Sequence, residues 1–300
     1  MTEQAPIECL LTPFMLEGGH VRGRMVYLSD VADIILSRYA YPKAVVKLLG
    51  ELIVVASMLS ANLKQNGVFT IQIRGNGLIP LIVVDAVYGG AVRGYAEVSD
   101  EAAAKIEKLK NPSPREMVGQ DSYLAITLDA GEDMQRYQGI VALEGDSVAE
   151  ALMEYFTRSE QLDVQLQLAV SEQAPWTAAG IIVERMPTGS DEAADANLEA
   201  WRYASALMGT VKGDELLDPL LDAQAMLFRL FHEEGVRVFP PHLLSVGCRC
   251  SRPRIHSLLM SMAMNDRADM IMDGTASVHC QFCNKSERFK PEELGLPPTQ

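Results

Sequence analysis

Cysteine is scarce in this chain, and its few copies are unevenly placed. Of five cysteines in 300 residues, Cys9 stands alone near the N-terminus, and the other four are Cys248, Cys250, Cys280 and Cys283. A small secreted fold held by disulfides needs a denser and more even set, so that class is excluded. In a reducing cytoplasm, clustered cysteines serve more often as metal ligands or redox thiols than as structural bridges.

Long hydrophobic runs are also lacking. The longest, near Leu52–Ala61 and Leu78–Val84, fall well short of the roughly 20 apolar residues that a membrane-spanning helix needs. No stretch near the N-terminus joins basic residues to an apolar segment as a signal peptide does. We therefore expect a soluble, cytoplasmic protein with no membrane partner.

Positive charge is in short supply. The chain has 26 Lys and Arg against 40 Asp and Glu, a formal net charge of −14. Such a surface repels phosphate backbones, so we expect no specific nucleic-acid partner. The sequence also has no Ser/His/Asp set and no phosphate-binding loop, and we expect no catalytic active site.

Apolar residues, in contrast, make up 48% of the chain, enough for a substantial core and more than one folded unit. Residues 1–182 carry both helical and strand patterns, which predicts a mixed α/β N-terminal domain in a protein of the α+β class. Helices are expected at Val31–Leu36 and Ala44–Leu63. Strands are expected at Phe69–Arg74, Ile79–Val84, Ala91–Val98, Ser122–Leu128 and Gln165–Val170.

Residues 183–236 read differently, because an acidic, small-residue stretch after Met186-Pro187 leads into helical signals only. One helical face carries Leu198, Trp201, Ser205 and Met208, and a second carries Leu220, Leu227, Leu230 and Phe231. The segment has few large apolar anchors, so it should depend on docking for its stability. We expect a metastable helical linker here.

The remaining residues, 237–300, hold two close cysteine pairs, Cys-x-Cys and Cys-x-x-Cys, separated by 29 residues. Two such pairs brought together by a folded insert supply the four soft ligands that a tetrahedral zinc ion requires. The insert fits this role, since a helix with Ile255, Leu258, Leu259 and Met262 on one face should follow Ser251, and a strand should run through Ser277–His279. We therefore expect a small zinc-binding domain with one Zn²⁺ held by the four cysteines.

Two alternatives remain for this site. The zinc could be purely structural, as in ribbons that only hold a small domain together. A histidine could also replace one cysteine, because His232, His242, His256 and His279 lie nearby in sequence. Cys9 has no partner in sequence and is expected to be an inert thiol.

A domain of this size depends on its metal. Zinc contributes on the order of 10–16 kcal/mol to the folding of such units, so its removal should unfold the domain. Disulfides within either close pair would form very short rings, which constrain the unfolded chain little and cannot replace the metal. Oxidation would then act as a switch, since thiolates are the oxidisable form of cysteine.

The chain resembles the redox-regulated, ATP-independent holdase chaperones known as the thirty-three-kilodalton heat-shock protein family. The resemblance covers nearly the whole chain. It rests on Val21–Arg24, Tyr41-Pro42, Leu48–Glu51, Gly75–Gly77, Arg93–Ala96, Tyr155-Phe156, Ser159–Gln161, Leu227–Glu234, Val236–Phe239, Cys248–Arg252 and Cys280–Asn284.

This resemblance implies a mechanism for the cysteines. In the family the reduced, zinc-bound protein is inactive; oxidation pairs adjacent cysteines, here Cys248 with Cys250 and Cys280 with Cys283, and releases the zinc. The linker then loosens, and the exposed apolar surface binds unfolding client proteins under oxidative stress. The active form in the family is a homodimer.

Two other classes stay open from the residues alone. A thiol–disulfide oxidoreductase could use Cys280-Gln281-Phe282-Cys283 as a redox pair, although no βαβ pattern surrounds it. A zinc-ribbon nucleic-acid module is disfavoured by the net charge.

Overall fold

The computed structural model describes residues 9–63, 66–129, 136–188 and 194–297. It divides the chain into two compact units, Met1–Val246 and Gly247–Gln300. The division into an N-terminal domain, a linker and a zinc domain stays a prediction. Part of the acidic stretch that opens the expected linker, residues 189–193, lies outside the described residues.

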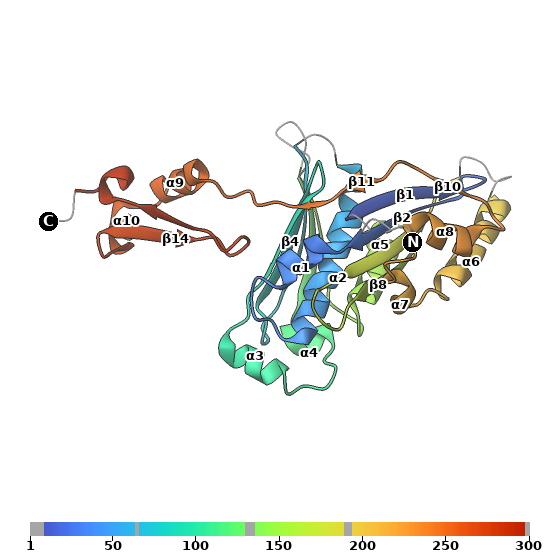
Figure 1. The fold of residues 1–300 in the computed structure, drawn as a ribbon, viewed down its shortest axis with the longest axis horizontal. Coiled ribbons are helices and arrows are strands. Elements are labelled where there is room, and N and C mark those ends of the chain that lie inside the picture. Colours follow the sequence, from blue (N-terminus) through green and yellow to red (C-terminus); the bar gives the residue numbers. More distant parts are fainter. Residues whose placement is uncertain (1–8, 64–65, 130–135, 189–193, 298–300) are drawn as a thin grey trace, which may run out of the picture. The chain divides into compact units, whose positions relative to one another are not determined.

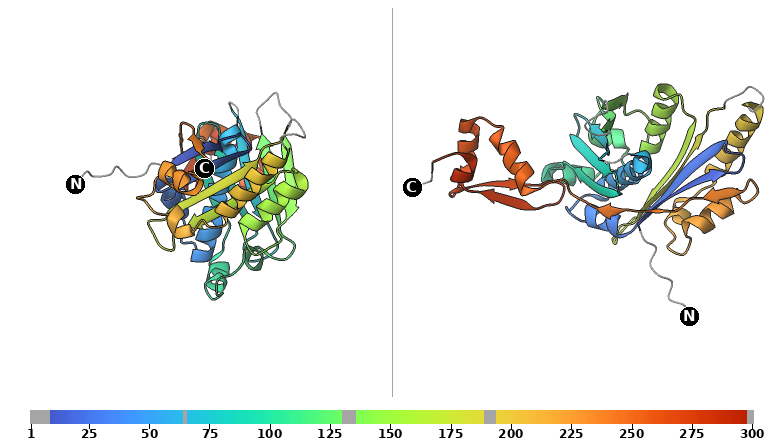
Figure 2. Two further views of the ribbon diagram at one scale, coloured as in Figure 1. Left: turned by 90° about the vertical axis from the view of Figure 1, so that its right-hand side faces the viewer. Right: turned by 90° about the horizontal axis from the view of Figure 1, so that it is seen from above.

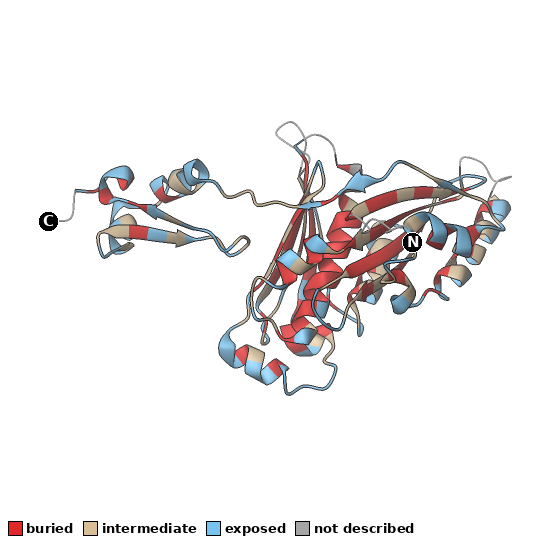
Figure 3. Ribbon diagram, in the orientation of Figure 1, coloured by how far each residue is buried: buried red, intermediate tan, exposed pale blue. Residues whose placement is uncertain are grey.

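The centre of the first unit is the helix α2, Lys43–Leu59. It is apolar around most of its circumference, as expected for a helix with core on several sides. It contacts β2, β8 and β9 of one sheet and β3, β4 and β5 of another, so it lies between two sheets (Figures 1 and 2). Figure 3 shows α2 buried along most of its length. The expected helix at Ala44–Leu63 is therefore present, with its last turn tightened into the 3₁₀ segment η1, Ser60–Asn62.

The first sheet has the strand order β10-β1-β2-β9-β8, with β11 also paired to β1. Its strands are β1 (Leu10–Leu16), β2 (Val21–Leu28), β8 (Val164–Val170), β9 (Ala178–Arg185), β10 (Val236–Val238) and β11 (His242–Leu243). Every residue of the inner strand β9 from Ala178 to Glu184 is buried, so the strand is covered on both faces of the sheet. A second layer must therefore cover the face that α2 leaves open.

The second sheet has the order β12-β5-β4-β3-β6-β7. Its strands are β3 (Val68–Arg74), β4 (Leu81–Val87), β5 (Ala91–Ala96), β6 (Tyr123–Asp129), β7 (Tyr137–Ala142) and β12 (Ser245–Val246). The strands expected near residues 69, 91, 122 and 165 are confirmed within a few residues, whereas β4 begins after Pro80 rather than at Ile79.

Short helices complete this unit: α1 (Asp30–Leu36), α3 (Asp100–Ile106), α4 (Pro114–Val118) and α5 (Val148–Ser159). Three of them begin at a serine side chain, Ser99, Ser113 or Ser147, that accepts a hydrogen bond from a backbone N–H in the first turn. Such caps satisfy donors that would otherwise lack a partner.

The helices of the expected linker are α6 (Ala194–Met208), α7 (Gly213–Leu216) and α8 (Ala223–Phe231). We call these three the linker helices. They cover the open face of the first sheet, because Met208, Leu227 and Phe231 are fully buried in a cluster with strand residues such as Phe14 and Ile181. Figure 2 shows the linker helices and α2 on opposite faces of this sheet.

One detail of the expected linker is wrong. Leu220 does not lie on a helical face, because α8 begins only at Ala223, and the Leu220 side chain is 72% exposed. The turn through Pro219 separates it from the helix that buries Leu227 and Phe231.

The second unit is small. It contains α9 (Arg252–Met260), α10 (Met264–Asp269), the 3₁₀ segment η3 (Pro291–Leu294) and a sheet of β13 (Ile271–Met272), β14 (Thr275–His279) and β15 (Ser286–Phe289). Its core consists of five buried side chains: Leu259, Ala276, Phe289, Leu294 and Leu296. Leu258, expected on the buried face of α9, is 64% exposed, because α9 packs against the small sheet and η3 through the side that carries Leu259.

Nowhere in the described ranges does a helix reach the length and apolar character that crossing a membrane requires.

Candidate metal centre

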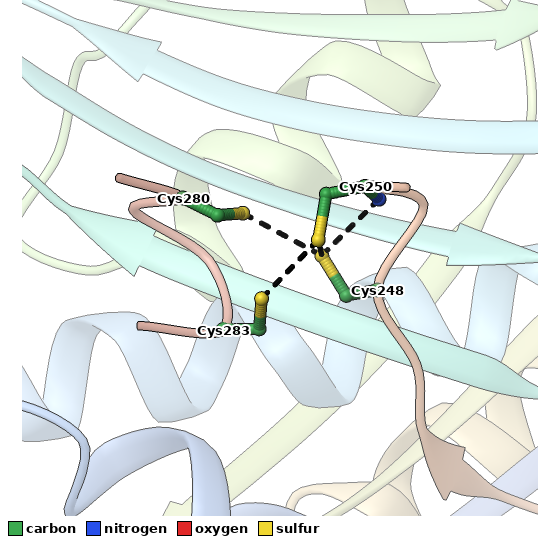
Figure 4. Close-up of side chains that lie close together, drawn as sticks. All are labelled: Cys248, Cys250, Cys280 and Cys283. Atoms are coloured by element: carbon green, nitrogen blue, oxygen red, sulfur yellow. Dashed lines mark hydrogen bonds between the residues drawn. The ribbon is translucent and has the colours of Figure 1, made fainter. Parts of the chain in front are cut away.

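The four clustered cysteines meet at one point in the second unit, with their side chains directed toward one another (Figure 4). We call Cys248, Cys250, Cys280 and Cys283 the cysteine cluster. Their sulfur atoms all lie within 4.8 Å of one another. The Sγ atoms of Cys248 and Cys250 are 3.2 Å apart, and those of Cys250 and Cys283 are 3.3 Å apart. All four are free thiols, since a disulfide would bring two sulfurs to about 2.05 Å.

This donor set fits a tetrahedral zinc ion. With Zn–S bonds of about 2.3 Å, neighbouring sulfurs of a tetrahedron are about 3.8 Å apart. The separation of 3.6 Å between the Sγ atoms of Cys248 and Cys280 is close to that value. Four sulfur ligands are also the set preferred by structural zinc sites and by few other divalent ions in proteins.

The second cysteine pair is positioned by a hairpin. Cys280 follows β14 and Cys283 precedes β15, so both lie in the connection between paired strands. The Cys280 N–H donates to the Lys285 carbonyl oxygen (2.9 Å), and the Asn284 N–H donates to the Cys280 carbonyl oxygen (2.8 Å). Asn284 takes a left-handed conformation with φ of 59°, which asparagine tolerates better than most residues. The closed turn directs both sulfurs inward.

The first pair is positioned by Arg252, a residue whose role the sequence analysis missed. Arg252 is the first residue of α9, two positions after Cys250. Its guanidinium donates to Glu287 (3.1 Å), to the Arg288 carbonyl oxygen (2.8 Å) and to Glu293 (2.6 Å). It also lies 4.4 Å from the ring centroid of Phe289. These contacts tie the start of α9 to β15 and thereby bring the two cysteine pairs together.

The thiols of the cluster influence one another. Burial, together with hydrogen bonds from the neighbouring thiols, raises the pKa of Cys250, and burial is the main cause of the raised pKa of Cys280. Four thiolates at this spacing repel one another, so the deprotonated cluster requires a positive charge at its centre. A divalent metal ion at the centre would supply that charge.

Histidine does not enter the cluster. Among the described residues, the group of ligand atoms that could hold a metal contains the four sulfurs and no histidine nitrogen. The ring of His279 instead lies 3.1 Å from the Ser286 hydroxyl, and the ring of His256 lies 2.7 Å from the Glu293 carbonyl oxygen. The alternative in which a histidine replaces a cysteine therefore receives no support.

Cys9 lies apart from the cluster, in the first unit. It is buried in the core that surrounds α2, and its Sγ is 3.6 Å from the Ser29 hydroxyl. The expectation that it is an inert thiol stays a prediction.

A second feature missed by the sequence analysis is a polar contact beneath α6. Asn197 is only 1% exposed. Its amide nitrogen donates to the Met186 carbonyl oxygen (3.0 Å), and its amide oxygen accepts from the Arg185 guanidinium. Arg185 also forms an ion pair with Asp163 (3.0 Å). We call the Asn197–Arg185–Met186 contact the linker clamp. In the sequence, the linker clamp corresponds to a single asparagine in a stretch of small and acidic residues. That signal is too weak to identify the contact.

Comparison with known proteins identifies relatives along almost the whole chain. The profile of the family described as "Hsp33 protein" matches residues 10–290. The "33 kDa chaperonin" of Caulobacter vibrioides is 34% identical, with 97% of this chain and 99% of the relative covered. The protein of the same name from Chromobacterium violaceum is 37% identical, with 95% and 92% covered.

A solved structure shares the fold. The heat shock protein 33 homologue of Thermotoga maritima superposes with a TM-score of 0.78 at 21% identity, covering 96% of this chain and 97% of that one. The resemblance first read from the cysteine pairs and the scattered glycine and aromatic motifs is confirmed by these matches. With a profile match and relatives extending over nearly its full length, this chain belongs to the Hsp33 family of chaperones.

Proposed function

We propose that this protein is a redox-regulated, ATP-independent holdase of the cytoplasm, which binds unfolding proteins under oxidative stress. The observation that carries the proposal is the cysteine cluster, built into a small unit whose apolar cluster comprises five buried side chains among the described residues. A fold with so small a core depends on the ligand that joins its parts.

In the reduced state, Cys248, Cys250, Cys280 and Cys283 hold one Zn²⁺ per chain. A zinc ion held there would supply the positive charge and the cross-link that keep the hairpin and the start of α9 together. Arg252 supports the same contact from outside the cluster through Glu287 and Glu293. This form is inactive.

Oxidation opens the site. Cys248 pairs with Cys250 and Cys280 pairs with Cys283; each new S–S bond takes two electrons from its two thiolates, and a peroxide or hypochlorous acid accepts them. Sulfurs joined in disulfides are no longer thiolates, so the four cysteines would no longer hold a zinc ion. The rings that these disulfides close are very short, so they restrict the unfolded chain little and do not restore the fold.

The client-binding surface lies under the linker helices. Their undocking uncovers apolar residues of the first sheet, including Phe14, Met25 and Ile181, all at most 2% exposed while covered. Surface of this kind binds the apolar segments that unfolding proteins display. The active form is a homodimer, which places two such surfaces in one particle.

The decisive experiment compares reduced and oxidised protein. Light scattering should record aggregation of a chemically unfolded client before and after treatment with hypochlorous acid, or with peroxide at raised temperature. We expect suppression only after oxidation, together with release of about one zinc per chain. Equal suppression in both states would refute the switch, and so would full retention of zinc after oxidation.

Two serine variants sharpen this test. Cys280→Ser removes one ligand of the cluster and should lower the zinc content of the reduced protein about 10-fold or more at limiting zinc, since a three-sulfur site lacks a tetrahedral ligand. Cys9→Ser makes the same chemical change outside the cluster and should keep both the zinc and the oxidation response. Loss of the oxidation response in Cys9→Ser would show that the switch depends on Cys9 and not on the cysteine cluster alone.

The oxidoreductase alternative has less support. Cys280 and Cys283 lie in a hairpin turn, and burial raises the pKa of Cys280, whereas a catalytic redox pair needs a lowered one. Catalytic turnover in an insulin reduction assay would favour that alternative.

A further inference from the structure

A large cavity lies in the first unit. Its volume is about 1120 Å³. Its wall is formed by the first turns of α2, the segment that joins α3 to α4, the start of α5 and the turn between β8 and β9. None of the cysteines lines it. The proposed redox mechanism makes no use of this cavity.

Glu51 contributes an unusual group to this cavity. Lys43, Lys47 and Glu51 are four residues apart along α2 and thus share one face of the helix, which lines the cavity. Glu51 is only 9% exposed. Within the described ranges, no hydrogen bond or ion pair engages its carboxylate, and the carboxylate oxygens are not among the fully enclosed polar atoms, so they open into the cavity that Glu51 lines. A carboxylate on so buried a residue normally has a partner. Burial raises the pKa of Glu51 to about 7, with Lys47 acting in the opposite direction.

The surrounding walls combine apolar surface with negative charge. Leu48, Ile106, Met117 and Trp176 supply the apolar part. The charged and titratable groups that face the cavity, besides Glu51, are Lys43, Lys47, Glu107, Glu116, Asp146 and Glu172. Acidic groups therefore outnumber basic ones, and both lysines are exposed at the rim, where water screens them.

We propose that this cavity binds a ligand with an alkylammonium or guanidinium group on an apolar body, anchored by the Glu51 carboxylate. A cation supplies the partner that the Glu51 carboxylate lacks within the protein, and a charge-assisted hydrogen bond is among the stronger polar contacts. The apolar walls take the body of the ligand, and Trp176, which lines the cavity, is the residue type whose ring attracts cations most strongly. The cavity is large enough for a basic side chain together with the adjacent residues of its polypeptide.

Two sources share this chemistry: a free organic amine, and a lysine or arginine side chain of a bound polypeptide. The inference does not depend on the redox switch, because the cavity and the cysteine cluster belong to different units. A negative result in the zinc experiments would therefore not affect the cavity proposal. A negative result in the cavity experiments would likewise not affect the proposed redox switch.

Calorimetric titration of the full-length reduced protein tests the proposal. The probes are phenethylamine and its neutral counterpart 2-phenylethanol, at pH 8. We expect the wild-type protein to bind the amine about tenfold or more tightly than the alcohol, since one charge-assisted contact is worth roughly that factor. Glu51→Gln should abolish the preference. Glu97→Gln makes the same charge change at an exposed position that does not line the cavity, and it should keep the preference.

The pH dependence of the wild-type protein gives a second readout that needs no variant. The amine stays protonated throughout, whereas Glu51 becomes neutral as the pH falls below about 7. Affinity for phenethylamine should therefore fall about tenfold between pH 8 and pH 5.5 while affinity for the alcohol stays level. Equal affinity for amine and alcohol at pH 8 would overturn the proposal, as would a pH-independent preference for the amine or a preference unchanged in Glu51→Gln.

A peptide arm separates the two sources. An extended peptide with one central lysine is compared with the same peptide carrying acetyl-lysine, each in competition with phenethylamine. Displacement by the lysine peptide alone assigns the cavity to basic side chains of polypeptides. Displacement by neither peptide, with the amine still bound, assigns it to free amines; both outcomes support the proposed chemistry. Equal displacement by both peptides would contradict a cation site.

Discussion

At the scale of single residues, the chemistry of the cysteines is inseparable from that of their neighbours. The four sulfurs approach within 4.8 Å only because a hairpin turn and the start of α9 face each other. Arg252 spans that contact, pairing with Glu287 and Glu293 while covering the Phe289 ring. Each ion pair is exposed and contributes little alone, so their value lies in fixing the geometry in which the metal binds.

Glu51 leads to a prediction about pH. Its pKa in the folded protein is about 7, above the ordinary value of 4.5, so between these values the folded protein binds more protons than the unfolded chain. The free energy of unfolding therefore decreases as the pH rises from about 4.5 to 7. Glu51→Gln removes this dependence and should be the more stable protein above pH 7, by on the order of 3 kcal/mol.

Urea unfolding followed by tryptophan fluorescence measures this difference, because both tryptophans, Trp176 and Trp201, lie in the first unit. The gap between Glu51→Gln and wild type should be close to zero at pH 4 and widen to its full size by pH 8. Glu97→Gln serves as the matched control. A gap that does not change with pH would show that Glu51 is solvated or paired in the folded protein.

At the scale of elements, β9 explains why the linker helices matter. A strand buried on both faces needs two covering layers. One layer is α2, which Ala178 and Ile182 face; the other is the linker helices, which Ala179, Ile181 and Val183 face. Removing the second layer leaves the sheet intact around α2 while exposing one apolar side of it.

The linker clamp should contribute to the free energy that keeps the linker helices docked on the first sheet. Asn197→Ala deprives the Arg185 guanidinium and the Met186 carbonyl oxygen of a buried partner, which costs about 1–3 kcal/mol of docking. We expect faster hydrogen exchange of the α6 amides in the reduced variant, by a factor of about 5 to 100. Oxidation should then activate it at a lower dose of hypochlorous acid.

Glu199→Gln, at an exposed position on the same helix, is the control and should exchange like the wild-type protein. Unchanged exchange in Asn197→Ala would mean that apolar packing by Met208 and its neighbours holds α6 without the clamp.

At the scale of the whole molecule, the two units differ in what stabilises them. The first has an extensive core around α2, while the second has an apolar cluster of five buried side chains and the cysteine cluster. Chelation of zinc under reducing conditions should therefore unfold residues 247–300 and leave residues 9–246 folded. Hydrogen exchange with mass spectrometry distinguishes the two units directly. Retention of protection in β14 and β15 after complete zinc removal would show that the small core suffices.

The elements that could be predicted from the sequence are those with a strong local pattern. The helix at 44–63 and the strand at Phe69–Arg74 have strong local periodicity, and both are present. The strands β1, β2 and β9 were not identified. Arg22 and Arg24 in β2 look solvent-facing until Glu184 of β9 pairs with them, and the continuous apolar run of β9 lacks the alternation of a half-buried strand.

The sequence by itself determined the family and the four-cysteine set, because both rest on residue types at fixed spacing along the chain. It did not determine which faces of the helices and strands pack against one another. The exposure of Leu220 and Leu258, the linker clamp under α6, the bridge of Arg252 and the unpartnered carboxylate of Glu51 each depend on residues distant in sequence. Such contacts exist only once the layers have packed, so only the tertiary structure reveals them.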